Sequence, residues 1–123
     1  MQKKYQIKGI VIHGDKRGKQ LGYPTANVAL DQEVPEGIYA ALVTVGNDIY
    51  QSATFVGPAK TFHKKEPYVE SFLFDFDRDI YGEEIVINLY DKVRENEAFT
   101  TVDALIEKMK QDVETIKEYF SSE

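Results

Sequence analysis

A stretch of glycines and cations near the N-terminus has the composition of an anion-binding loop. Residues 13–22 (HGDKRGKQLG) place three glycines and three cations on a chain whose formal net charge is −6. Glycines let backbone N–H groups approach a phosphate closely, and lysine adds a point charge. The stretch is not a Walker A motif, because Gly14 and Gly18 are one residue too close and Gln20 stands where a Mg²⁺-binding hydroxyl is needed. Composition alone favours a solvated loop over a phosphate site and excludes neither.

The next residues, Pro24-Thr25-Ala26-Asn27, could hold a metal ion. Thr25 and Asn27 are two residues apart, so in extended backbone their side chains point to the same side. A hydroxyl and an amide oxygen are hard ligands that suit Mg²⁺, which often bridges to phosphates. The alternative is a turn in which both side chains bond their own backbone. The residues alone favour the turn.

Glu70 is the best candidate for a general base. Its same-face neighbours in residues 68–76 are all aromatic: Tyr68, Phe72, Phe74 and Phe76. If that face is inward, partial loss of solvent makes Glu70 a better proton acceptor near neutral pH. If the opposite face, with Val69, Ser71 and Leu73, packs against the core, Glu70 stands outside. Both faces are largely apolar, so alternation leaves the two arrangements open.

Two further basic positions have both functional and structural interpretations. Residues 60–65 (KTFHKK) combine cations with an aromatic ring and could cover a ligand or form a solvated charge run. Arg94 could contact an anion, stack on an aromatic ring or pair with nearby carboxylates. Pairing with carboxylates is the commonest use of such an arginine.

Hydrophobic periodicity predicts an all-β domain with one helix. Strands are predicted over residues 5–12, 37–45, 49–56, 68–76 and 83–90, and long loops over residues 13–27 and 57–67. From Val102 onward apolar residues recur at helical spacing, and Thr100 with Asp103 fits a capping box. Several short strands with turns between them are typical of a barrel or sandwich, which the helix must cover.

Length and composition limit the class of protein. The 123 residues suit one domain spanning 1–123, and 42% hydrophobic residues suffice for a core. There is no cysteine, which excludes disulfides and thiolate chemistry. The acidic balance disfavours binding to nucleic acid. With no apolar run long enough for a membrane span and no signal-like start, a cytoplasmic protein is the expectation.

The order of these motifs resembles the riboflavin kinase family. The resemblance rests first on the loop after the first strand, where Pro24-Thr25-Ala26-Asn27 matches the most specific motif of that family. It continues through Pro35-Glu36-Gly37-Ile38-Tyr39, Val69-Glu70, Phe74-Asp75-Phe76 and Asp79-Ile80-Tyr81-Gly82-Glu83. In the helix, Asp112 falls at a position that the family commonly fills with Asp. Nearly the whole chain is covered in the order of the family.

The resemblance implies a six-stranded antiparallel Greek-key barrel with a C-terminal helix. It implies transfer of phosphate from ATP to the 5′-hydroxyl of riboflavin, giving FMN, with Mg²⁺ (Zn²⁺ in some members) as the ion. Thr25 and Asn27 would bind the metal and the nucleotide phosphates, and Gly14 and Lys19 would contact those phosphates. Glu70 would accept the proton of the ribityl hydroxyl.

The resemblance also places Arg94 in the loop on the flavin side. Two departures from the family pattern lie nearby: Lys60 where Pro often precedes Thr-Phe, and Glu95 where Pro often follows the arginine. They keep a second hypothesis open, a flavin-binding or regulatory module that has lost catalysis. In many bacteria this domain is fused to an FMN adenylyltransferase domain, so such a fusion is possible here.

Overall fold

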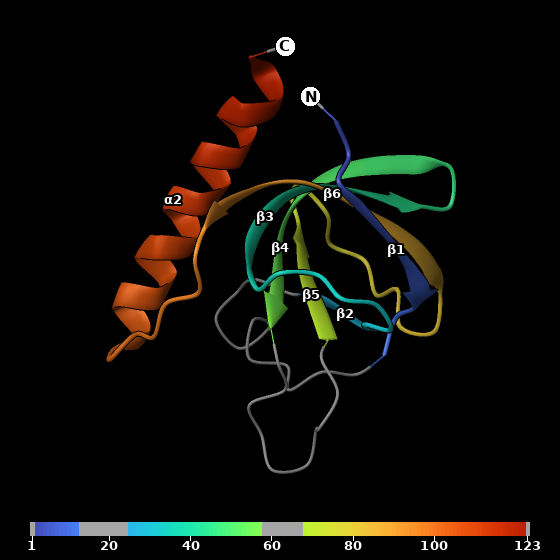
Figure 1. Cartoon of the computed structure of the whole chain (residues 1–123), viewed down its shortest axis with the longest axis horizontal. Coiled ribbons are helices and arrows are strands. Elements are labelled where there is room, and N and C mark those ends of the chain that lie inside the picture. Colours follow the sequence, from blue (N-terminus) through green and yellow to red (C-terminus); the bar gives the residue numbers. More distant parts are fainter. Residues whose placement is uncertain (1, 13–24, 58–67, 123) are drawn as a thin grey trace.

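Six antiparallel strands form a nearly closed barrel with one helix along its side (Figure 1). The computed structural model describes residues 2–12, 25–57 and 68–122. The elements are β1 (Tyr5–Ile10), β2 (Ala26–Ala29), β3 (Gly37–Val45), β4 (Asp48–Gly57), β5 (Tyr68–Leu73), β6 (Glu84–Arg94) and α2 (Val102–Ser121). The strand order is β1-β6-β3-β4-β5-β2, and the predicted barrel with a C-terminal helix is confirmed.

Among the described residues, one isolated bridge connects the segment after β1 with β2, the other edge strand. Just beyond β1, the backbone N–H of Ile12 donates to the carbonyl oxygen of Asn27 in β2 at 2.8 Å. The first and last strands of the sheet are thereby joined, which turns an open sheet into a barrel.

Several predicted boundaries were wrong for identifiable reasons. The last strand, predicted over residues 83–90, extends to Arg94, because it stays paired with β3 as far as Ile38. Residues 26–29 form β2, although residues 26 and 27 were expected in a loop, because pairing with β5 stabilises a strand too short to show periodicity. The predicted strand 68–76 ends at Leu73, and Asp75 takes a left-handed φ of 56° that an extended strand cannot contain. The helix cap is Thr101, whose hydroxyl accepts the N–H of Ala104 at 3.1 Å, so the predicted capping box at Thr100 is wrong.

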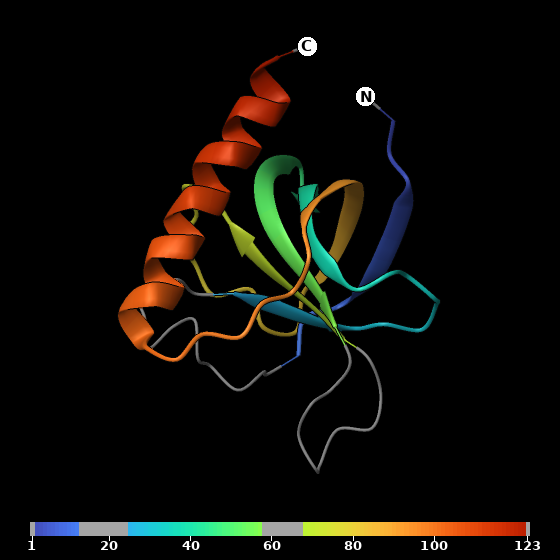
Figure 2. The same ribbon diagram turned by 60° about the vertical axis from the view of Figure 1, so that its left-hand side comes forward.

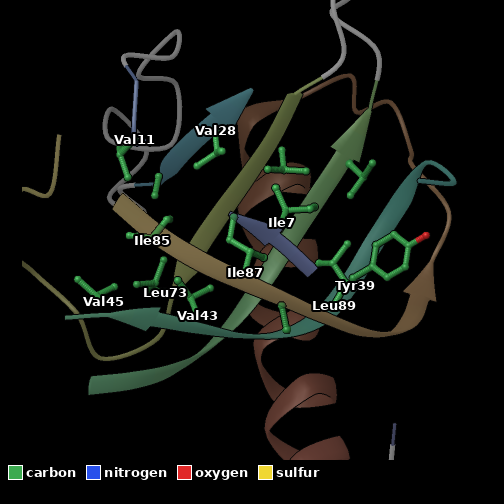
Figure 3. Packing of buried hydrophobic residues seen from close by; sticks show 14 of the residues in the cluster. Ile7, Val11, Val28, Tyr39, Val43, Val45, Leu73, Ile85, Ile87 and Leu89 are labelled. Carbon is green, nitrogen blue, oxygen red and sulfur yellow. The ribbon is translucent and has the colours of Figure 1, made fainter. Parts of the chain in front are cut away.

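Apolar side chains from every strand fill the barrel (Figure 3). Alternate residues of β3 and β6 point inward, among them Val43, Ile87 and Leu89, each with no exposed surface. Full burial of one such side chain contributes about 1.5–3 kcal/mol. Along β4 and β5 the interior also holds buried hydroxyls: Thr54 bonds Ser52 at 3.0 Å and Ser71 at 2.8 Å.

Helix α2 packs on the outside of the barrel (Figure 2). Ile116 is fully buried in a second core with Ala40 and Phe74. The C-terminal half of the predicted apolar stripe of the helix therefore packs into the core. It does not extend to the first turn, since Val102 is 53% exposed. Within the described part of the chain, no helix has the length and apolar character needed to cross a membrane.

Two carboxylates attach the helix region to β6. Asp112 of α2 is buried and accepts two hydrogen bonds from the Arg94 guanidinium, Nε–Oδ1 at 2.9 Å and Nη2–Oδ2 at 2.8 Å. Asp91 of β6 accepts from the Tyr119 hydroxyl at 2.6 Å and pairs with Lys4. The hydrogen bonds from Lys4 and Tyr119 lower the pKa of Asp91, and the hydrogen bond to Asp91 raises the pKa of Lys4.

We predict that the two carboxylates differ in their importance for stability. Asp112→Ala leaves a guanidinium that is only 17% exposed without its counter-charge, and such a loss costs about 3–5 kcal/mol. Asp91→Ala removes a half-exposed ion pair and the hydrogen bond from Tyr119, which together cost about 1–2 kcal/mol. Urea unfolding of both variants at neutral pH checks this. Equal losses would show that the Arg94–Asp112 pair contributes no more than a surface contact.

Candidate functional site

Three side chains from adjacent strands form a row on the outer face of the barrel. Asn27 of β2 lies opposite Glu70 of β5, and Glu70 lies opposite Phe55 of β4. Directly opposed residues share a face of the sheet. Their chain neighbours Val28, Val56 and Val69 are buried in the barrel. The row Asn27–Glu70–Phe55 therefore faces away from the barrel interior.

This arrangement decides which face of β5 is inward. Val69, Ser71 and Leu73 point into the barrel, and Glu70 stands half-buried on the other side. Of the four aromatics expected beside Glu70, Phe74 and Phe76 lie beyond the end of β5. The arrangement in which Glu70 faces the barrel interior is therefore wrong. The alternative, in which Val69, Ser71 and Leu73 face the core and Glu70 stands outside, is confirmed.

Thr25 contacts Glu70 directly. Its hydroxyl donates a hydrogen bond to Glu70 Oε1 at 3.1 Å. Asn27, two residues further along, faces Glu70 across the β2–β5 pair. The i, i+2 spacing thus brings Thr25 and Asn27 to the same side of the chain. With its proton directed at Glu70, the Thr25 oxygen keeps lone pairs for another partner.

Asn27 carries an unpaired oxygen. The residue is only 4% exposed, and its Oδ1 is buried with no hydrogen-bond partner among the described residues. A buried acceptor left unpaired costs about 1–3 kcal/mol, so such an atom in a folded protein calls for an explanation. An amide oxygen is a hard ligand, and a hard cation beside Thr25 and Asn27 would satisfy it. The residues present therefore fit a Mg²⁺ ion.

Aromatic rings border the row at the ends of β4 and β5. The rings of Phe55 and Tyr68 are 6.0 Å apart. Gly57, the last residue of β4, leaves room for the Phe55 ring, because a Cβ added there would lie 2.4 Å from the Phe55 Cζ atom. The aromatic side chains beside Glu70 thus lie near the ends of β4 and β5.

Arg94 is the last residue of β6. Strands β3 and β4 separate it from β5. Besides Asp112, it donates through Nη1 to the carbonyl oxygen of Glu95 at 3.1 Å, and its guanidinium carbon is 6.0 Å from the Phe99 ring centre. The carboxylate and aromatic contacts considered for Arg94 are thus both present. A contact with flavin stays a prediction.

The remaining predicted positions lie outside the described residues. Gly14 and Lys19 belong to residues 13–24, which end immediately before Thr25. Lys60 belongs to residues 58–67, which connect Gly57 to Tyr68. In the sequence, both segments therefore adjoin residues of the row or its aromatic border.

Sequence reasoning missed Asn96. Its Nδ2 donates to the carbonyl oxygen of Val56 at 3.3 Å, while its Oδ1 is buried and has no partner in the described part of the chain. No sequence signal marked it, because a single asparagine between glutamates resembles an ordinary solvated loop residue.

Comparison with known proteins agrees with this arrangement. The Flavokinase family model, described as riboflavin kinase, matches residues 1–120. The bifunctional riboflavin kinase/FMN adenylyltransferase of Bacillus subtilis (strain 168) is 40% identical over 124 residues, covering 96% of this chain and 39% of its own length. The chain therefore spans well under half of that relative.

Solved structures share the fold. Riboflavin kinase from Trypanosoma brucei superposes with a TM-score of 0.70 at 25% identity, covering 95% of this chain and 80% of that one. A protein from Streptococcus pneumoniae named as a macrolide-efflux protein superposes with a TM-score of 0.83 at 36% identity, covering 91% of this chain and 38% of that one. The family match, the identity to a named kinase and the shared barrel agree: the chain belongs to the riboflavin kinase family.

Proposed function

We propose that this chain transfers the γ-phosphate of ATP to the 5′-hydroxyl of riboflavin, giving FMN and ADP. The observation that carries the proposal is the contact of Thr25 with Glu70, beside the unpaired oxygen of Asn27. One carboxylate and two neutral hard oxygens are what phosphoryl transfer needs from a protein, since its catalysis is mostly positioning and charge neutralisation.

Glu70 is the proton acceptor in this proposal. It takes the proton of the ribityl 5′-hydroxyl as that oxygen bonds to the γ-phosphorus and the bond to the β–γ bridging oxygen breaks. The Thr25 hydroxyl holds one carboxylate oxygen, Oε1, and thereby orients the other. The carboxylate then returns its proton to solvent when products leave.

Thr25 and Asn27 would hold the metal ion, which when bound neutralises charge on the phosphates. Their oxygens favour Mg²⁺ over Zn²⁺, because Zn²⁺ in proteins is usually bound by nitrogen and sulfur ligands.

Gly14 and Lys19 remain proposed contacts of the phosphates, through a backbone N–H and an ammonium group. Arg94 remains a proposed residue of the flavin side, and the cytoplasm the proposed location.

The B. subtilis relative is named for two activities, and the chain matches only part of it. We propose that the matched part makes FMN and that adenylylation of FMN requires the rest of such a protein.

The direct test is turnover of the chain with riboflavin, ATP and Mg²⁺, followed by chromatography of flavins. Mg²⁺-dependent FMN with no FAD supports the proposal. Flavin binding without FMN would replace it with the regulatory module.

We predict that Glu70→Gln lowers kcat by about 10²- to 10⁴-fold, the usual contribution of a general base. ATP affinity should change little, because the amide keeps the shape of the side chain and its Oε1 can still accept the Thr25 hydrogen bond. Steady-state kinetics and nucleotide titration measure the two quantities. Glu84→Gln, at an exposed position on β6, is the matched control. A Glu70→Gln enzyme with undiminished kcat would remove Glu70 from the proton-accepting role.

We predict that Asn27→Leu separates stability from activity. The substitution replaces a buried, unpaired oxygen with an apolar group of similar size, so the protein without ligands should keep its Tm or gain a few degrees. Metal-dependent FMN formation should fall by at least tenfold, because a metal ligand is lost. Thermal unfolding and the turnover assay check both. A clear drop in Tm together with normal activity would contradict the role of Asn27 as a metal ligand.

A further inference from the structure

The side chain of Asn96 is held at one end and unpaired at the other. Its Nδ2 donates to the Val56 carbonyl oxygen, which fixes the orientation of the amide because a carbonyl needs a donor. Its Oδ1 is left buried and without a partner. Among the described residues, only the Oδ1 atoms of Asn27 and Asn96 are buried side-chain oxygens in this condition. Both carry the cost of an unsatisfied acceptor.

Asn96 is attached to the barrel next to the proposed base, on the side away from the metal ligands. Val56 is the neighbour of Phe55, which lies opposite Glu70, while Asn27 lies on the other side of Glu70. Adjacent strands are about 4.8 Å apart, so these groups span about two strand spacings. Across the sheet, the order is Asn27, Glu70, then the strand that anchors Asn96.

In the proposed reaction, this order would give the two substrates different sides of Glu70. In phosphoryl transfer the attacking and leaving oxygens are roughly in line on opposite sides of the phosphorus. If the nucleotide phosphates lie on the Asn27 side, the attacking hydroxyl approaches from the β4 side of Glu70. The unpaired oxygen of Asn96 is therefore on the side of the phosphate acceptor.

The backbone that presents Asn96 is fixed in advance. Arg94, two residues earlier, is bound by both carboxylate oxygens of Asp112 and bonds the carbonyl oxygen of Glu95. An amide on a backbone held by these contacts loses less conformational freedom when a ligand binds, so the ordering cost of a hydrogen bond to it is smaller.

We propose that Asn96 Oδ1 accepts a hydrogen bond from the phosphate-acceptor substrate and helps to select it. This inference rests on the proposed function. Riboflavin offers two kinds of donor, the imide N–H of its ring and the hydroxyls of its ribityl chain. A site that provides a buried acceptor rejects an analogue lacking the matching donor, because the acceptor is then left unpaired.

Asn96→Ala tests the proposal. Loss of one such hydrogen bond should weaken riboflavin binding about five- to tenfold. The KM for riboflavin rises accordingly, whereas the KM for ATP stays within about twofold. Asn88→Ala, at a half-buried asparagine of β6 whose side-chain oxygen accepts a hydrogen bond from Gln6, is the matched control. Asn96→Ser replaces the alanine variant if that variant is not folded by circular dichroism.

Substrate analogues give the readout that a structural role would not move. N3-methylriboflavin lacks the imide donor, and ribityl deoxy analogues each lack one hydroxyl. For one of these, the wild-type enzyme should bind about five- to tenfold more weakly than riboflavin, and Asn96→Ala should show no further loss. That analogue identifies the donor. If Asn96→Ala instead discriminates against every analogue as strongly as the wild type, the inference is wrong.

Failure of the inference differs from failure of the proposed function. A wild-type chain that makes FMN, with unchanged KM for riboflavin in Asn96→Ala, overturns the inference alone. A wild-type chain that neither makes FMN nor binds riboflavin overturns both.

Discussion

The register between β2 and β5 is the constraint on which the candidate site depends. Asn27 faces Glu70 only because these strands pair without a shift. A slip of one residue would turn Asn27 into the barrel and bring Val28 to the outer face. Val28, Val69 and Leu73 oppose such a slip, since each would lose its place in the core. Packing of apolar side chains inside the barrel therefore keeps Asn27 and Glu70 aligned on its outer face.

Much of the fold could be predicted from the sequence, because strong local patterns agreed with the final packing. The β3–β4 hairpin has long strands and a glycine turn, Gly46 with φ 61°, and the amphipathic helix repeats its stripe over several turns. The short strand β2 could not be predicted in this way. Four residues carry too little periodicity, and their pairing partner lies more than forty positions further along the chain. The end of β5 could not be predicted either, because it depends on a single residue with a left-handed backbone conformation, Asp75.

The site was predictable in its residue types and less so in its geometry. Thr25, Asn27 and Glu70 were chosen for their chemistry, and the structure brings them together. Alternation could not decide which face of β5 was inward, because aromatic residues on the outer face are nearly as apolar as the core. Asn96 carried no signal at all. Its significance arises from burial and an unpaired atom, and both are properties of tertiary structure.

The bridge between the two edges of the sheet joins Ile12 to Asn27, a residue of the candidate site. Closure of the sheet and occupancy of the site therefore involve the same residue, the first through its backbone carbonyl and the second through its side chain. A ligand that binds the closed form in preference to the open one shifts the equilibrium toward closure, by an amount that grows with ligand concentration. A ligand bound to the Asn27 side chain would in this way also favour the hydrogen bond that joins Ile12 to β2.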